Sequence, residues 1–205
     1  MKTEILRVDH PSAISHAADV LQNGGLVAFP TDTVYGLASL PFKGECVEGL
    51  FSAKGRNNAH AIAILIGDYP DLKRVVDEFD EKSLRLAHRF WPGPLTLVVP
   101  KLATLPAALS QDGTIGVRMP DHPIALALLR KIGPLAVTSA NISGQDNTNT
   151  AEEVSRQLNG RVHLILDGGK TSGGVPSTVV DCISSPLVIL RQGPISFEAI
   201  KAALL

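Results

Sequence analysis

The amino-acid sequence predicts an α/β fold: a single domain with a twisted, mixed β-sheet and helices packed against it. Helix-like and strand-like segments alternate along most of the chain, as they do in layered α/β domains. Near residues 167–191, strand-like runs follow one another without a helix, and such neighbours often pair antiparallel. A length of 205 residues fits one ordinary domain. We therefore expect residues 1–205 to form that domain, without an additional C-terminal domain.

The first half of the chain alternates helix and strand signals. Segment 12–23 repeats apolar residues at helical spacing and is followed by Gly24 and Gly25, which end helices. Asp80 fits the N-cap of a helix that ends at Trp91. Short apolar runs bounded by Gly or Pro indicate buried strands. These patterns predict helices over 12–23, 46–53 and 80–91, and strands over 26–29, 62–66, 95–99 and 114–118.

The second half has clearer helix starts. Thr150 and Glu153 match a capping box, in which each side chain bonds the backbone N–H of the other residue. Ser196 is a suitable N-cap for a final helix. The patterns predict helices over 122–132, over 150–158 and after 196, and strands over 135–138, 162–166, 178–182 and 187–190.

Composition narrows the class of protein. A net charge of −1 and an aromatic content of 4% disfavour a globally basic protein that stacks on single-stranded nucleic acid. The chain has only two cysteines, Cys46 and Cys182, and they are far apart in the sequence. This pattern does not indicate a disulfide-stabilised fold, and it suits a reducing compartment. The chain has no apolar run of the roughly 18 residues that a membrane helix needs, and its N-terminus lacks the apolar stretch of a signal peptide. We expect a cytoplasmic protein that does not insert into membranes.

Five polar regions stand at the ends of predicted strands or helices, where open α/β sheets bind ligands. They are 30–36 with Thr31 and Thr33, 52–60 with Lys54, Arg56 and His60, 114–120 with Thr114 and Arg118, 138–144 with Ser139 and Asn141, and 175–178 with Ser177, beside 191–194 with Arg191. The four cations among them indicate an anionic small-molecule ligand. Both a nucleotide phosphate and an amino-acid carboxylate fit.

Each region also has a purely structural interpretation. Lys54 and Arg56 can complement the dipole at a helix C-terminus instead of clamping a phosphate. Arg118 can belong to a surface ion pair, and hydroxyl-rich loops often only bond their own backbone. The segment 168–171 resembles a P-loop, but Leu164 stands where that motif requires Gly. The six histidines lack metal-ligand spacing, so we expect no metal ligand from protein side chains.

Seven motifs in order resemble one family, the YrdC-type threonylcarbamoyl-adenylate synthases, in their single-domain form. They are FPTDTVYGL, AKGR, WPGPLTLV, GVRMPDHP, TSANISG, GGVPSTVVD and LRQGPIS, and their order and rough spacing match the family over residues 26–194. The resemblance implies a nucleotidyltransferase that condenses L-threonine, bicarbonate and ATP into threonylcarbamoyl-AMP and pyrophosphate. It also implies a concave, positively charged cleft and a product that serves tRNA threonylcarbamoyladenosine modification.

The same resemblance implies roles for individual residues. The catalytic set is Lys54, Arg56, Ser139 and Asn141. ATP is expected at Lys54, Arg56, His60, Thr114, Ser139, Asn147 and Arg191, and threonine at Thr31, Thr33, Arg118, Val137 and Ser177. Mg²⁺ is expected mainly on the triphosphate, because this ion keeps few protein ligands at such sites. We also expect Lys54→Ala to reduce adenylate formation without disturbing the fold.

The chain departs from the family pattern at three positions: Asn57 and Ala61 stand where Pro is usual, and Leu65 where His is frequent.

The resemblance also implies partners, namely downstream tRNA threonylcarbamoyl transferase proteins, and contact with tRNA or RNA through the basic cleft. Two alternatives to this enzymatic function remain: an RNA-binding module of the same fold, and a paralogue that binds nucleotide without making threonylcarbamoyl-AMP.

Overall fold

The computed structural model describes residues 2–55 and 61–205. Its strands are β1 (Glu4–Arg7), β2 (Val27–Phe29), β3 (Gly36–Ser39), β4 (Ala63–Leu65), β5 (Leu95–Pro100), β6 (Thr114–Arg118), β7 (Leu135–Ser139), β8 (Leu164–Asp167), β9 (Thr178–Asp181) and β10 (Val188–Arg191). Its α-helices are α1 (Ala13–Gln22), α2 (Gly44–Lys54), α3 (Glu81–Phe90), α4 (Pro123–Ile132), α5 (Ala151–Leu158) and α6 (Phe197–Ala202). Two 3₁₀ helices, η1 (Tyr69–Arg74) and η2 (Ala107–Leu109), complete the described elements.

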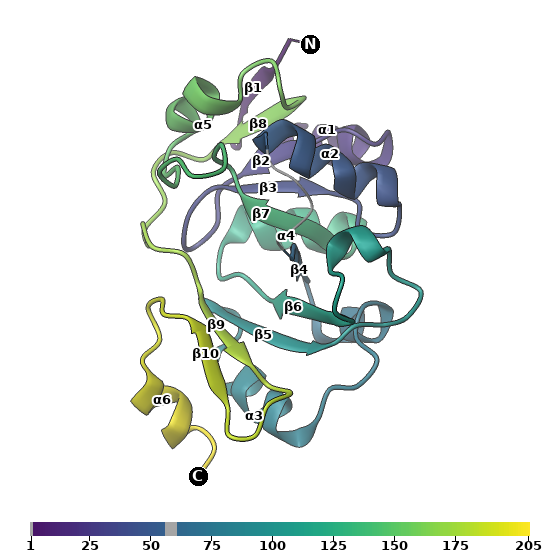
Figure 1. Ribbon diagram of the computed structural model, residues 1–205. Coiled ribbons are helices and arrows are strands. Elements are labelled where there is room, and N and C mark those ends of the chain that lie inside the picture. The colour runs from purple at the N-terminus through teal and green to yellow at the C-terminus, as the bar shows by residue number, and fades with distance from the viewer. Residues whose placement is uncertain (1, 56–60) are drawn as a thin grey trace.

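The described strands form one mixed sheet, in the order β1-β8-β2-β3-β7-β4-β6-β5-β9-β10. Figure 1 shows that the two chain termini lie at opposite ends of this sheet. Strands β9 and β10 pair antiparallel, as the sequence predicts. Strand β8 does not join them, because it pairs in parallel with both β1 and β2. The long segment between β8 and β9 therefore has to cross most of the sheet.

The helices cover the sheet on both faces. Consecutive residues of β7 show the division, since Leu135 and Val137 belong to one buried cluster and Ala136 to the other. The first cluster includes Leu21 of α1 and Leu128 of α4, whereas the second is built from α2, α3 and α5. Side chains alternate between faces along a strand, so the sheet is sandwiched between the two groups of helices. This confirms the predicted mixed α/β fold.

The predicted helix caps are present. The Asp80 carboxylate accepts a hydrogen bond from the backbone N–H of Ser83 (2.8 Å). Thr150 and Glu153 form the complete capping box, and the Ser196 hydroxyl accepts from the N–H of Ala199 (3.2 Å). These caps satisfy N–H groups that have no partner inside a helix.

Two strands were not predicted. Strand β1 is an edge strand whose residues are largely exposed, so it lacks the apolar run of a buried strand. Strand β3 begins with Gly36 and contains only four residues, which gives it weak strand propensity. It forms because β2 and β7 flank it on both sides. The tertiary environment, rather than local sequence, therefore determines β3.

Cys46 and Cys182 are both buried, and each has a free thiol. Within residues 2–55 and 61–205, the structure contains no helix that is both long and apolar enough to cross a membrane.

Candidate functional site

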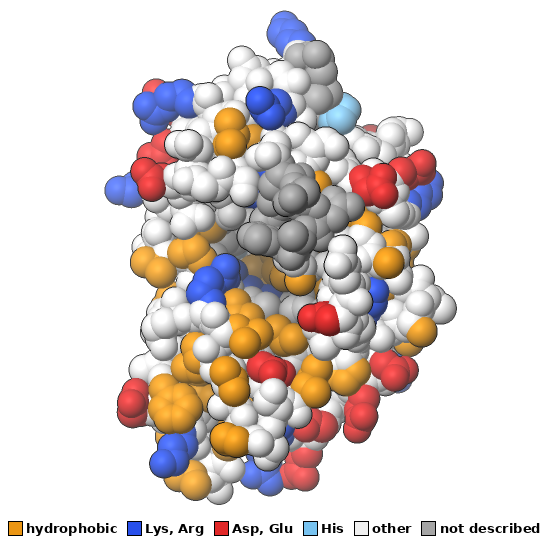
Figure 2. All heavy atoms as spheres, viewed as in Figure 1, with side chains coloured by type: hydrophobic (Ala, Val, Ile, Leu, Met, Phe, Trp, Pro, Cys, Tyr) orange, Lys and Arg blue, Asp and Glu red, His pale blue; other side chains and the backbone are white. Residues whose placement is uncertain are grey.

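A cavity of about 410 Å³ lies over the centre of the sheet. Figure 2 shows a hollow near the middle of this face, with apolar side chains inside it and a basic side chain at its edge. Eight of the predicted site residues line the cavity: Thr31, Thr33, Arg118, Val137, Ser139, Asn147, Ser177 and Arg191. They come from separate loops and strand ends, so the fold brings together residues that the sequence spreads over 160 positions.

The floor of the cavity is one face of four neighbouring strands. Its lining residues are two apart on each strand: 63 and 65, 96 and 98, 116 and 118, 137 and 139. Register pairs Ala63 with Val137 and Val98 with Gly116. Cross-strand partners lie on the same face of a sheet. The sheet therefore presents these side chains to the cavity as a single surface.

Arg118 ends β6 and is almost completely buried, with its side chain 7% exposed. Its Nε donates to the carbonyl of Gly93 (2.9 Å), Nη1 to the Thr33 hydroxyl (3.0 Å) and Nη2 to the Asp32 carboxylate (2.5 Å). A guanidinium has five N–H groups, so two remain, one on each Nη nitrogen. Burial lowers the pKa of Arg118, and Asp32 opposes this shift. Arg118 thus belongs to a buried ion pair rather than to a surface one.

The hydroxyls beside Arg118 form a chain with a fixed direction. Thr31 donates to the carbonyl of Val34 (2.6 Å), so its single hydrogen is used. In the contact between the two hydroxyls (3.0 Å), Thr33 must therefore be the donor to Thr31. Arg118 in turn donates to Thr33. As a result, Thr33 can only accept a further hydrogen bond, and it would bind an N–H or O–H group of a ligand.

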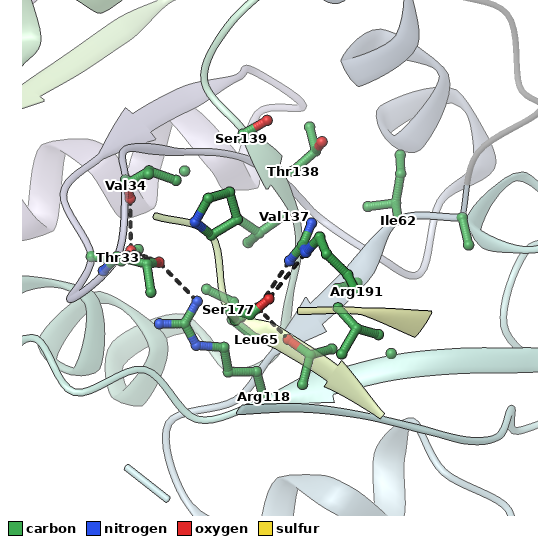
Figure 3. A pocket seen from close by; sticks show the side chains of 18 of the residues that line it. Thr33, Val34, Ile62, Leu65, Arg118, Val137, Thr138, Ser139, Ser177 and Arg191 are labelled. Atoms are coloured by element: carbon green, nitrogen blue, oxygen red, sulfur yellow. Dashed lines mark hydrogen bonds between the residues drawn. The ribbon is translucent and has the colours of Figure 1, made fainter. Parts of the chain in front are cut away.

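A second polar cluster surrounds Ser177. Arg191 donates through Nε to the Ser177 carbonyl (3.0 Å) and through Nη2 to its hydroxyl (3.1 Å). The buried Thr96 hydroxyl lies 2.8 Å from the same hydroxyl. Figure 3 shows Arg118 and Arg191 on opposite sides of Ser177. Partial burial and then the charge of Arg118 lower the pKa of Arg191.

Lys54, the last residue of α2, is 2% exposed. Its Nζ donates to the carbonyl oxygens of Ser139 (2.5 Å) and Asn141 (2.6 Å). The ammonium therefore holds the loop after β7, rather than only complementing the dipole of its own helix. Gly55 follows with a left-handed φ of 64°, which turns the chain out of α2. Contact between Lys54 and a phosphate stays a prediction.

The other predicted residues lie elsewhere. The Asn141 side chain donates through Nδ2 to the carbonyls of Ile142 (2.9 Å) and Gln145 (2.8 Å) in its own loop, and its Oδ1 accepts from Lys54 Nζ (3.5 Å). The Thr114 hydroxyl donates to Asp112 (2.8 Å), outside the cavity lining. Arg56 and His60 lie outside the described residues, as does Asn57. Ala61 and Leu65, the other two departures from the family pattern, both line the cavity.

Several lining residues were missed by the sequence analysis. Thr96 and Val98 alternate with the core residues of β5, so they face the cavity. Gly116 lies on the neighbouring strand β6, opposite Val98, and a Cβ there would approach Thr96 Cγ2 to 3.0 Å. The available signal was the alternation of a polar residue, Thr96, with leucines. It becomes informative only once the face of the sheet is known.

The segment between β8 and β9, residues 168–177, closes one side of the site. Gly174 donates its N–H to the carbonyl of Thr33 (2.8 Å). A Cβ on Gly173 would come within 2.5 Å of the Asp32 carbonyl oxygen, so glycine is needed for this approach. At the start of the segment, the Tyr35 hydroxyl donates to the carbonyl of Gly169 (2.8 Å). These contacts place Ser177 beside the threonine-rich loop.

Comparisons with known proteins identify the relatives of this chain. The family profile described as "Telomere recombination" (Sua5/YciO/YrdC) matches residues 19–193. A protein of Bacillus subtilis named "Threonylcarbamoyl-AMP synthase" is 41% identical over 98% of this chain and 59% of its own length. A "Putative threonylcarbamoyl-AMP synthase" of Mycobacterium tuberculosis is 39% identical, over 93% of this chain and 88% of its own.

A solved structure is also similar. The crystal structure of Pyrococcus abyssi Sua5 complexed with L-threonine superimposes with a TM-score of 0.94 and 39% identity, covering 100% of this chain and 61% of that one. The chain thus spans about three-fifths of the length of some relatives and most of the length of others. The profile match over most of the chain and these similarities establish that it belongs to the Sua5/YciO/YrdC family.

Proposed function

We propose that this chain condenses L-threonine, bicarbonate and ATP into threonylcarbamoyl-AMP and pyrophosphate, as a nucleotidyltransferase. The observation that carries the proposal is that one cavity brings together the residues expected for threonine and several of those expected for ATP. Relatives named threonylcarbamoyl-AMP synthase and a similar structure described as complexed with L-threonine support it.

Threonine would enter at the Arg118 side. The two remaining N–H groups of Arg118 suit the two oxygens of a carboxylate. Thr33, which can only accept a further hydrogen bond, suits the amino or hydroxyl group of the same molecule. Val137 and Leu65 supply an apolar wall for a methyl group. The arrangement matches a small amino acid that carries a donor next to its carboxylate.

ATP would lie across Ser139 and Arg191. Bicarbonate and the amino group of threonine form a carbamate with loss of water. A carbamate oxygen attacks the α-phosphorus, a new P–O bond forms, and the bond to the pyrophosphate leaving group breaks. Such a reaction depends mainly on positioning and on stabilising negative charge. The Ser139 hydroxyl lines the cavity, and Lys54 fixes the backbone of the same loop. We assign these residues to orientation and charge stabilisation, without a covalent enzyme intermediate.

Further parts of the proposal concern the ion and the setting of the reaction. Mg²⁺ would enter bound to the triphosphate, which supplies most of its oxygen ligands. The product would pass to tRNA threonylcarbamoyl transferase proteins in the cytoplasm, with tRNA contact at the cleft. We also propose that residues 1–205 act as one domain in this reaction.

The decisive experiment measures pyrophosphate release by the purified chain. We expect release only when threonine, bicarbonate and ATP are all present, with threonylcarbamoyl-AMP detected by mass spectrometry. Release that does not depend on threonine would contradict the proposal. Tight tRNA binding without any such release would instead favour the RNA-binding alternative, and ATP binding alone would favour the paralogue.

A further inference from the structure

Among the described residues, two arginines line the cavity, and they differ in whether a carboxylate balances their charge. Arg118 is paired with the carboxylate of Asp32, and both side chains are largely buried, at 7% and 12% exposed. Arg191 donates only to the carbonyl and hydroxyl of Ser177, and among the described residues it has no ion-pair partner. The Arg118 side therefore carries no net charge from this pair, whereas Arg191 contributes a full positive charge.

This difference affects ligands according to their charge. A polyphosphate carries several negative charges, and each of them is repelled by a neighbouring carboxylate. An amino-acid carboxylate carries only one. A buried arginine without a carboxylate partner would attract a polyphosphate more strongly than an amino-acid carboxylate. An arginine paired with Asp32 loses much of this preference for the more highly charged ligand. The directed hydrogen bonds of Arg118 remain available for a planar carboxylate.

We propose that Asp32 is a specificity-determining residue: its charge keeps polyphosphate away from Arg118, so that the Arg118 side takes the amino-acid carboxylate and the Arg191 side takes the polyphosphate. This inference rests on the proposed function, because it explains how two anionic substrates bind at different positions in one cavity. Asp32 acts through Arg118 and is not itself part of the cavity lining. Its position is held by the loop between β2 and β3, against which Gly173 packs.

A purely structural role for Asp32 would give different results. Asp32→Asn keeps an oxygen that can accept from Arg118 but removes the charge. If Asp32 only stabilised the fold, this change would lower stability and leave the choice of ligand unaltered. If its charge sorts the anions, the substitution changes which ligand binds at Arg118.

The experiment uses isothermal titration with L-threonine and with inorganic tripolyphosphate, in the absence of turnover. In the wild-type protein, we expect threonine to bind with the same affinity whether or not tripolyphosphate is present. In Asp32→Asn, we expect tripolyphosphate to bind at least about tenfold more tightly, which corresponds to about 1.4 kcal/mol, and to compete with threonine. Asp32→Glu, which keeps the charge, should behave like the wild type.

Asp68→Asn is the matched control, because it removes a carboxylate that pairs with Arg130 (3.3 Å) on an exposed part of the surface. It should leave both affinities unchanged. Unaltered tripolyphosphate affinity in a folded Asp32→Asn variant would overturn the inference. If that variant does not fold, the wild type still provides a test, since competition between threonine and tripolyphosphate there would also overturn it. A wild-type protein that binds no threonine would instead contradict the proposed function.

Discussion

Replacing Lys54 by methionine tests the role that the structure gives to this buried cation. Methionine has a similar length and can fill the same space, but it cannot donate hydrogen bonds. The substitution would leave the carbonyls of Ser139 and Asn141 without the ammonium that now lies 2.5 Å and 2.6 Å away. The sequence alone suggested that Lys54 could be removed without harm to folding. Its burial at 2% exposure reverses that expectation.

The expected loss of stability follows from these two bonds. A hydrogen bond to a charged group contributes about 1.5–3 kcal/mol net. Part of this loss is offset because methionine, unlike an ammonium, is buried without a desolvation cost. We expect Lys54→Met to lower the free energy of unfolding by about 3 kcal/mol. For a chain of this size, that corresponds to a fall in Tm of roughly 6–12 °C.

Thermal unfolding followed by circular dichroism measures this change. Lys201→Met is the control, since Lys201 also lies in the last turn of a helix but is exposed. It should change Tm by no more than about 2 °C, as surface substitutions usually do. If Lys54→Met unfolds at the same temperature as the control, the ammonium does not hold the loop after β7. The stabilising role assigned to Lys54 would then be wrong.

Three further outcomes are expected. Arg118→Lys should raise the KM for threonine at least tenfold while changing the KM for ATP less than twofold, because Lys cannot offer a planar pair of donors; equal changes in both would contradict this. Gly173→Ala should push residues 168–177 away from the Asp32 carbonyl and weaken threonine binding several-fold in calorimetry, whereas Gly44→Ala, whose Cβ would meet only Pro106 at 4.0 Å, should not. Burial raises the pKa of Cys182 from 9.0 to about 11, so the folded state keeps a proton that the unfolded state loses. The free energy of unfolding should therefore fall by about 2–3 kcal/mol between pH 9 and 11. In Cys182→Ala, urea titrations repeated over this pH range should show a smaller fall in the free energy of unfolding.

Local sequence predicted the elements whose signals are local. The helix starts at Asp80, Thr150 and Ser196 were recognised because a cap depends on residues only three positions apart. Strand β3 was missed, since its short sequence has weak strand propensity and its stability comes from β2 and β7. The position of β8 beside β1 was also beyond reach, because it depends on pairing across 160 residues.

The candidate site divides in the same way. Thr33, Arg118 and Ser177 were identified because they lie in motifs that resemble one family, since hydroxyl and cationic side chains at strand ends also have a purely structural explanation. Thr96 was missed because it lies inside a strand whose alternate residues, Leu95, Leu97 and Val99, belong to the core. Its exposure to the cavity follows from which face of β5 the helices leave open. That choice is made by the packing of the whole sheet and not by the sequence around Thr96.

Asp32 illustrates why a list of candidate residues does not yet define a ligand. In the sequence, an aspartate between two threonines is best explained as a turn residue that bonds its own backbone. In the sheet, β2 and β6 are separated by β3, β7 and β4, yet the loop after β2 reaches the end of β6 and places Asp32 against Arg118. The pair joins residues 86 positions apart. Local chemistry therefore identified the cation, whereas its net charge, and with it the class of anion it can bind, is set by a contact that only the fold creates.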